Sequence, residues 1–522
     1  MTPSRIPNES AIAAVHRRES ALYARFNRRA MFVALLALYV QLGLIFAHLL
    51  AGASLLFSLF NLLFCLSALA VARFESELLV FVLATNANWV FSFSAYVYST
   101  SHLRLVDDKL FGAEDSIGLA FDFHLGCVVA YAIFRLLWQA YFPWRPDLRT
   151  YDRALALGSY KNILLVVGVA LQLLNGAIPN PTLSAFASQF SSLLWLGLAF
   201  HFMSKGRFVF DLKTVAFLVV FAFIASLSNG RTILILAIFF IALCWIYYAD
   251  RLLRVRYLVA IYLGFGFLNV FSDIVLDLRL NQRDVNENRS VESVVSKLVS
   301  LDNVEALINP FHKSASAASV DQRSYVIDYN NAFVMPYYSG VDSLSARFVA
   351  LPMLDSVCGR YHSVDRVAWG AIGNMMSAIL PNVGQEKDLI YSDRLTWELG
   401  LRDYGNVGRP EVTNACELYT MVGGVGLFFV SLVEFLLALI QVELLKNLLA
   451  MPALWIAVIP QVLVWMTVST TALASAAYLA RGIPLTILSV WLLYRFAAYT
   501  RARSPRTLVR SGPPSLTLNP DL

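Results

Sequence analysis

The chain has 522 residues, of which 58% are hydrophobic and 15% are charged, and its formal net charge is +6. Soluble domains contain about 45–50% apolar and about 25% charged residues, so this composition excludes a soluble enzyme held by one anchor. The basic residues gathered near both termini are typical of membrane topology and do not require a nucleic-acid partner. We therefore expect an all-α polytopic membrane protein.

Residues 1–30 are polar and basic and precede the first apolar run. They lack a small-residue cleavage site close behind that run, so they do not resemble a signal peptide. We predict a cytoplasmic tail with room for an amphipathic surface helix.

Twelve stretches are long and apolar enough to cross a bilayer, which takes roughly 20 residues. Nine lie in residues 31–275 and three in residues 418–499, and residues 500–522 form a C-terminal tail. The predicted spans are 31–50, 53–73, 78–98, 117–139, 161–178, 184–203, 213–229, 232–249, 257–275, 418–445, 452–470 and 482–499.

Arginine and lysine in short loops predict the orientation of the spans. With twelve spans, the basic loops before residues 31, 161, 213 and 257 and the tail after residue 499 all fall on one side. This side is predicted to be the cytoplasm, so both termini are cytoplasmic and the remaining loops lie outside.

One outer segment is long, residues 276–417. Loops of this length without structure are uncommon, so we expect a folded and mainly helical periplasmic domain, with a helix interrupted at Pro352. The segment contains ten arginines and only three lysines. Arginine is favoured where phosphate or carboxylate is held bidentately, which points to a lipid-linked phosphate or diphosphate.

The spans carry few charges, with Asp122 and His124 in the fourth and Glu434 in the tenth. Glu434 is expected to be buried and to pair or hydrogen-bond with another span. No metal-ligand spacing and no nucleotide-binding fingerprint stands in a credible context. We expect no metal and no cofactor. Cys358 and Cys416 both fall in the outer segment, where a disulfide is permitted but not required.

Three stretches resemble the Wzy-type O-antigen polymerases, which are oligosaccharide repeat-unit polymerases related to O-antigen ligases. They are "SLSNGRTILIL", "DSLSARFVALPMLDSV" with the following "GRYHSVDRVAWGAIGNMMSAILPNVGQEKD", and "RPEVTNACELYTMVGGVGLFFVSLVEFLLAL". The resemblance covers mainly residues 213–445. The family often has Pro-Arg and Lys-Pro pairs where this chain has "ILPNVGQEKD".

The resemblance implies a glycosyltransferase C-like membrane enzyme of the bacterial inner membrane. Its donor would be a glycan on undecaprenyl diphosphate, and its acceptor the non-reducing sugar of another lipid-linked repeat unit. The acceptor hydroxyl attacks the anomeric carbon and undecaprenyl diphosphate leaves. Membrane lipid surrounds the protein, and a chain-length regulator protein is a further partner to consider.

Five residues are the candidates for the chemistry. Arg231 follows an Asn-Gly turn signal, so it is either a solvated hairpin arginine or an anchor for the diphosphate. Arg347 is a phosphate-binding or catalytic candidate, or a salt-bridge residue, and Asp342 is its partner or a base. His362 is a base or a structural histidine. Glu417 is expected to open the tenth span at the outer interface.

The remaining candidates would bind the diphosphate or the glycan. Arg366 and Arg409 supply cations, although Arg409 also fits an ordinary ion pair with Glu411. Tyr338 and Tyr361 are aromatic residues suited to a sugar groove. Three rival functions remain open, namely an O-antigen ligase, a transporter or flippase for lipid-linked sugar, and a non-catalytic assembly protein.

Overall fold

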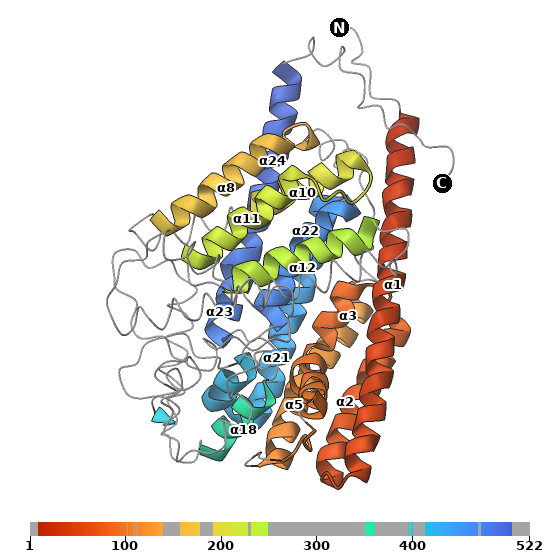
Figure 1. The fold of residues 1–522 in the computed structure, drawn as a ribbon, viewed down its shortest axis with the longest axis vertical. Coiled ribbons are helices and arrows are strands. Elements are labelled where there is room, and N and C mark those ends of the chain that lie inside the picture. The colour runs from red at the N-terminus through yellow and green to blue at the C-terminus, as the bar shows by residue number, and fades with distance from the viewer. Residues whose placement is uncertain are drawn as a thin grey trace, which may run out of the picture.

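The computed structural model describes twelve parts of the chain, and all of its regular structure there is helical, without strands. The described parts are residues 9–101, 103–108, 110, 112–138, 157–177, 192–227, 231–248, 350–360, 395, 398–399, 413–467 and 471–503. The helices form an elongated bundle (Figure 1).

Five described helices are long and apolar enough to cross a membrane. They are α1 (Glu9–Leu50), α2 (Leu55–Phe74), α5 (Ala113–Ile133) with its π-helical continuation η2 (Phe134–Trp138), α21 (Asn414–Leu449), and the run of α23 (Ala472–Ala477), η5 (Tyr478–Gly482) and α24 (Ile483–Arg503). The chain is therefore a multi-pass membrane protein, as its composition predicts.

The segment after α2 passes the same test only as a whole, as a broken span or a re-entrant loop. It consists of α3 (Leu78–Ala84), the π-helix η1 (Asn88–Phe93) and α4 (Ser94–Ser101), and its two halves are bent by 71°. The sequence predicts a span over residues 78–98, and the structure adds that the backbone turns at residues 85–87. Thr85 and Asn86 lie at this break, inside the bundle.

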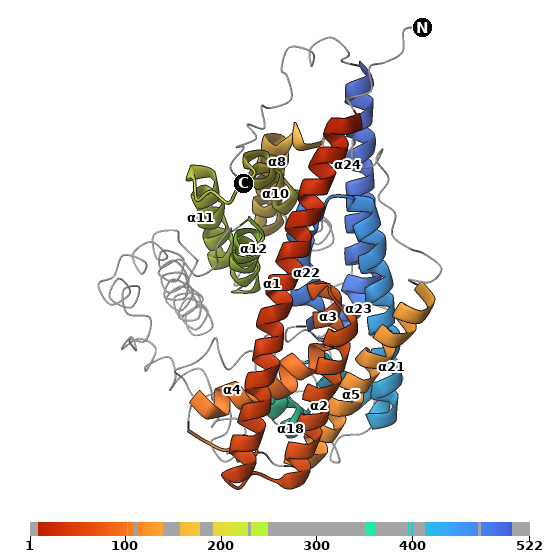
Figure 2. The same cartoon turned by 90° about the vertical axis from the view of Figure 1, so that its right-hand side faces the viewer.

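Five further helices occupy predicted spans but are shorter, with 14 to 18 residues. They are α8 (Lys161–Ala177), α10 (Ser192–Lys205), α11 (Leu212–Leu227), α12 (Arg231–Tyr248) and α22 (Pro452–Thr467). The predicted hairpin around Arg231 corresponds to α11 and α12, which are separate helices that pack together. Figure 2 shows α8, α10, α11 and α12 grouped on one side of α1. The predicted span 257–275 lies outside the described residues.

At one end of the bundle, side-chain contacts join the loops and tails that are predicted to be cytoplasmic from their basic residues. Arg18 donates to the carbonyl of Gly206, and the Tyr247 hydroxyl donates to Glu19 at 2.8 Å. The Tyr160 hydroxyl donates to Thr500 at 2.9 Å. We call this the inner end. These contacts agree with the predicted alternation of the spans.

The opposite end, which we call the outer end, joins the other set of connections. The backbone N–H of Ser54 donates to Asp107 at 2.7 Å, and the backbone N–H of Val106 donates to His48 at 3.2 Å. Ser54 also caps the first turn of α2, because its side chain accepts from the backbone N–H of Phe57.

The sharpest feature of the bundle is a fold in α21 at Gly423, whose φ of 76° and ψ of −178° are not helical. Asn414 and Glu434 touch through their side chains although they are 20 residues apart. In a straight helix they would lie roughly 30 Å apart. Residues 414–422 therefore fold back as a short arm against the long arm, residues 424–449.

The long arm of α21 packs closely on α5, and glycine makes this possible. A Cβ at Gly126 would overlap Ser431 and would lie 2.6 Å from the carbonyl oxygen of Phe428. Small residues allow membrane helices to approach at backbone distance. At its inner end the long arm ends at Ala450, whose backbone has a left-handed conformation. Pro452 is the first residue of α22.

One described helix comes from the predicted outer segment. This is α18 (Leu351–Arg360), which contacts both α5 and α21, and its Leu351, Leu354 and Val357 are buried. Pro352 lies in its first turn, where a missing N–H costs nothing, so the expected interruption is the start of a helix. The outer segment thus reaches into the bundle.

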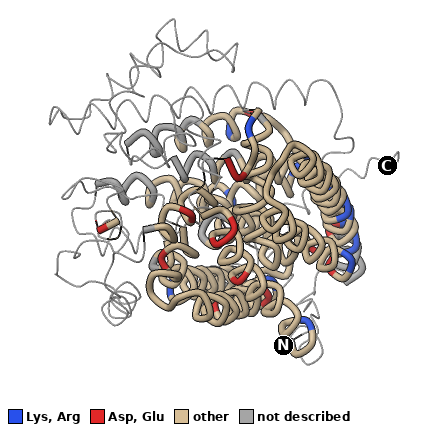
Figure 3. Tube along the Cα trace, turned by 90° about the horizontal axis from the view of Figure 1, so that it is seen from below, with Lys and Arg blue, Asp and Glu red and all other residues tan. Residues whose placement is uncertain are grey.

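The outward faces of the long helices are apolar. Phe32, Tyr39 and Phe46 follow one another every seven residues along α1, and each is more than half exposed. Charged residues are sparse in the described part of the chain when the bundle is seen along its axis (Figure 3). Both features fit helices that face lipid.

Candidate functional site

Most of the predicted site residues lie in parts of the chain that the structure does not describe. Arg231 is the first residue of α12, and its side chain is outside the described atoms. The others outside the described residues are Arg347, Asp342, His362, Arg366, Arg409, Tyr338 and Tyr361. Whether these residues meet at one site stays a prediction.

Glu417 is the predicted site residue that the structure describes. It lies in the short arm of α21 and has no exposed surface. Thr413 caps this arm, and the Thr420 hydroxyl donates to the Glu417 carbonyl at 2.8 Å. The sequence prediction placed Glu417 at the outer interface. The structure places it inside the bundle, because the fold at Gly423 turns the short arm inward.

Glu434 accepts hydrogen bonds from the short arm of its own helix and from α23. The Asn414 side-chain amide donates to both carboxylate oxygens at 2.8 Å, and the Ser475 hydroxyl donates to one of them. Ser475 also lies 3.6 Å from the sulfur of Met466, whose backbone carbonyl accepts from the Asn86 amide at 3.0 Å. We call these five residues the Glu434 cluster.

Interrupted helices bring the cluster together. Asn86 lies at the break between α3 and η1, and Met466 lies in the last turn of α22. Asn414 and Ser475 lie in first turns that are capped by Thr413 and Thr471. Helix N-termini favour negative charge and helix C-termini favour positive charge. Such ends meeting inside a bundle are typical of ion and substrate sites in membrane proteins.

A second buried polar network has a structural character. The Gln41 amide of α1 donates to Asn88 at 2.9 Å and to Ser92 at 2.7 Å, and Ser92 donates to Asn61 of α2. Asn88 returns a hydrogen bond to Gln41, and Asn61 donates to the Phe57 carbonyl at 2.8 Å. These hydrogen bonds tie η1 to the first two helices and so stabilise the broken segment.

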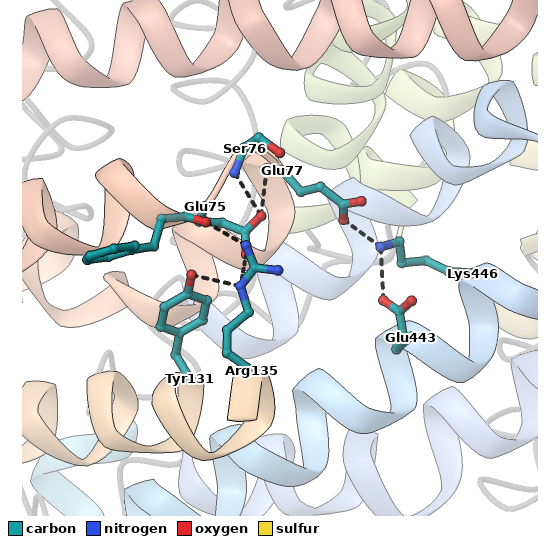
Figure 4. A network of polar contacts seen from close by, with 8 residues as sticks. Glu75, Ser76, Glu77, Tyr131, Arg135, Glu443 and Lys446 are labelled. Carbon is teal, nitrogen blue, oxygen red and sulfur yellow. Dashed lines mark hydrogen bonds and ion pairs between the residues drawn. The ribbon is translucent and has the colours of Figure 1, made fainter. Parts of the chain in front are cut away.

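At the inner end, Glu75 holds the turn between α2 and α3 (Figure 4). It accepts from the backbone N–H groups of Ser76 and Glu77 and pairs with Arg135 at 3.4 Å. Arg135 in turn donates to the Tyr131 hydroxyl and to the Phe74 carbonyl. Burial raises the pKa of the Glu75 carboxyl, while the Glu77 N–H and the Arg135 guanidinium oppose that rise.

Lys446 lies on the other side of Glu77 (Figure 4). We call Glu75, Glu77, Arg135, Glu443 and Lys446 the inner cluster. Lys446 lies 2.5 Å from Glu77 and 2.9 Å from Glu443, and its ammonium stands over the Trp455 ring at 4.4 Å from the ring centre. Two carboxylates and one aromatic face therefore satisfy one ammonium. Because the pairs join α3, α21 and α22, a role in holding these helices explains the cluster.

Asp355 of α18 caps α5 from outside that helix. Its carboxylate accepts from the Gly112 N–H at 2.8 Å and from the Ser116 hydroxyl at 3.1 Å. It is 2% exposed, so the predicted outer segment is fixed to the bundle by a buried charge at a helix N-terminus.

Cys358 and Cys416 are free thiols on α18 and α21, which pack together. Burial raises the pKa of the Cys358 thiol, and the charge that a neighbouring Cys416 thiolate would carry adds to that rise. A thiol with a raised pKa is a poor nucleophile at neutral pH, so these cysteines are not reactive groups. Within the described residues, no group of three or more histidine, cysteine, aspartate or glutamate side chains could hold a metal ion.

Comparison with known proteins gives no relative. No family model, no curated protein and no solved structure matches this chain.

The sequence reasoning missed Asn86, Asn414, Ser475 and Asp355. Asn86 lies within a predicted span, where an amide side chain is costly, and that was the available signal. Ser475 and Asn414 precede predicted spans and give no such signal. Their meeting with Glu434 depends on the fold at Gly423 and on the start of α23.

Proposed function

We propose that the chain is a polysaccharide polymerase of the bacterial inner membrane. It would transfer a glycan from undecaprenyl diphosphate to the non-reducing end of another lipid-linked repeat unit, on the periplasmic face. The proposed enzyme has twelve spans and both termini in the cytoplasm. The observation that carries the proposal is the meeting of α18 with the short arm of α21. Both belong to stretches that resemble the polymerases, and both are buried.

The proposed chemistry needs a base and a cationic site. Glu417 is the acid in the resembling motif that the structure describes, and we assign it the role of taking the proton from the acceptor hydroxyl. Arg231 and Arg347 would neutralise the leaving diphosphate.

The test is polymerisation by the purified full-length protein. A lipid-linked repeat unit is supplied, and product length is read on a gel. We expect chains longer than one unit, and Arg231→Ala and Arg347→Ala should each abolish elongation. Arg17→Ala, at an exposed arginine of α1, is the control and should elongate normally. Full activity in both test variants would refute the assigned site.

The same assay separates the rival enzyme. An O-antigen ligase would transfer glycan only when a lipid A core acceptor is present, and it would leave the repeat units unextended. Single-unit transfer to that acceptor, without elongation, would replace the polymerase proposal with the ligase.

The Glu434 cluster favours a second candidate, a transporter or flippase for lipid-linked sugar. Ionisable groups and broken helices deep in a bundle are typical of transporters. Proteoliposomes loaded with a fluorescent lipid-linked sugar would distinguish the two functions. Movement between leaflets without a change in the sugar would support the transporter and count against the polymerase.

A further inference from the structure

Glu434 lies deep in the bundle by its place in α21. It is 11 residues beyond Gly423 and 15 before Leu449, so it lies roughly 16 Å from the fold and roughly 22 Å from the inner end of the helix. The hydrocarbon core of a bilayer is about 30 Å thick. The carboxylate is therefore placed near the middle of the membrane.

No ion pair within the described part of the chain involves Glu434. The side chains that donate hydrogen bonds to it in this part of the chain are the neutral ones of Asn414 and Ser475. Ionisable side chains on the elements beside it include Asp122, His124 and Cys127 of α5, Arg135 of η2, and Tyr478 and Arg481 of η5, and Glu417 lies on the short arm of its own helix. An ionised carboxylate at this depth calls for one positive charge.

Two further oxygens of the Glu434 cluster lack a donor. They are the side-chain oxygens of Asn86 and Asn414, which are buried and accept no hydrogen bond. Asn86 is 5% exposed and Asn414 is 9% exposed. Buried polar atoms in native proteins almost always have a partner. A donor or a cation is thus expected beside these oxygens.

A metal cation satisfies this arrangement better than a proton does. One proton serves one or two oxygens, whereas a sodium ion takes several oxygen ligands together. The Asn414 side-chain nitrogen lies 2.8 Å from both carboxylate oxygens of Glu434. Rotating the amide group by 180° would put the Asn414 side-chain oxygen in that place. A cation between them makes that orientation favourable.

The charge of the ion follows from the charge of the site. The cluster contains one carboxylate, and its other oxygens are neutral. Divalent calcium sites combine several carboxylates. Backbone carbonyls at the end of a broken helix, like that of Met466, are typical ligands for sodium in transporters.

We propose that the Glu434 cluster is a binding site for a monovalent metal cation of sodium's class. The carboxylate of Glu434 supplies the charge, and the side-chain oxygens of Asn414 and Ser475 complete the ligands from the short arm and from α23. The bound ion would link the short arm of α21, through Asn414, to the long arm, through Glu434. The proposal does not depend on the polymerase function and is tested without it.

The first experiment measures thermal unfolding of the purified full-length protein in sodium chloride and in choline chloride at equal ionic strength. An ion that binds only the folded state raises the melting temperature when the ion concentration exceeds the Kd of the site. We expect sodium to raise the Tm of the wild-type protein by several degrees over choline, and Glu434→Gln to lose this shift. Glu443→Gln, on the same helix but in the inner cluster, should keep it.

A second measurement needs no variant. A hydrophobic carbodiimide modifies carboxyl groups inside membranes, and mass spectrometry of the peptide with Glu434 reports its modification. Sodium should slow the labelling of Glu434 several-fold relative to choline. Equal Tm values and equal labelling in the two salts would overturn the proposal, and so would a response to pH without any response to sodium.

Discussion

Asp355 shows how one side chain fixes a segment to the bundle. Its carboxylate accepts from the Gly112 N–H and the Ser116 hydroxyl. Asp355→Ala leaves both donors without this partner, so we expect a loss of about 1–3 kcal/mol in the free energy of unfolding, seen as a lower Tm. Ser356→Ala removes a hydrogen bond within α18 only and is the control. Equal Tm changes in the two variants would contradict the capping role.

Glu75 gives the protein a specific pH dependence. Its pKa is raised in the folded state, so the folded protein binds the proton more tightly than the unfolded chain does. The free energy of unfolding therefore increases as pH falls through the raised pKa, and the gain is complete below the ordinary value of 4.5.

Glu75→Gln should remove this contribution. Wild type should gain stability relative to the variant when pH is lowered from neutral towards 5, because the variant has no carboxyl to protonate. Denaturation midpoints of both proteins across this range provide the measurement. Parallel curves would show that Glu75 does not titrate there.

At the scale of the helix, Gly423 is required by backbone conformation. A Cβ there would meet no atom within 4 Å, yet its φ and ψ lie in a region open almost only to glycine. Gly423→Ala should cost about 1–3 kcal/mol. Gly43→Ala is the matched control, because it also has open space but an ordinary φ, and it should be neutral or stabilising. Equal Tm changes would refute the conformational argument.

Gly126 is required by packing. Gly126→Ala would force α5 away from the Phe428 backbone, and we expect destabilisation of about 1–3 kcal/mol. Gly118→Ala lies two turns earlier on α5, where a Cβ would sit 3.7 Å from Phe60, an ordinary contact. The Tm of the Gly118 variant should stay near wild type. A similar fall in both variants would show that the close crossing is unimportant.

Apolar length predicted the five long membrane-crossing helices, but it did not predict where helices break. Hydropathy averages over a window, so it places residues 78–98 and 418–445 in spans without sensing the turns at Asn86 or Gly423. Positive φ at one glycine and a tertiary contact 20 residues away leave no periodic signal. For the same reason Glu417 was expected at the outer interface, and its burial was not foreseen.

At the scale of the whole molecule, the two ends of the bundle should face opposite sides of the membrane. Arg104 is exposed at the outer end and Arg17 near the inner end. In intact cells an impermeant maleimide should label Arg104→Cys, and it should label Arg17→Cys only after permeabilisation. The unmodified protein is the control for its own cysteines. Labelling of Arg17→Cys in intact cells would reverse the assigned orientation.

The folded-back arm of α21 also sets an order of events during synthesis. Glu434 emerges from the ribosome 41 residues before Ser475, which at about 5–20 residues per second is a delay of about 2–8 s. During that interval the carboxyl has entered the membrane without one of its two hydrogen-bond donors. The hydrogen bonding of Glu434 can therefore be complete only after Ser475 has been translated, so this part of the core is finished by the carboxyl-terminal helices of the chain.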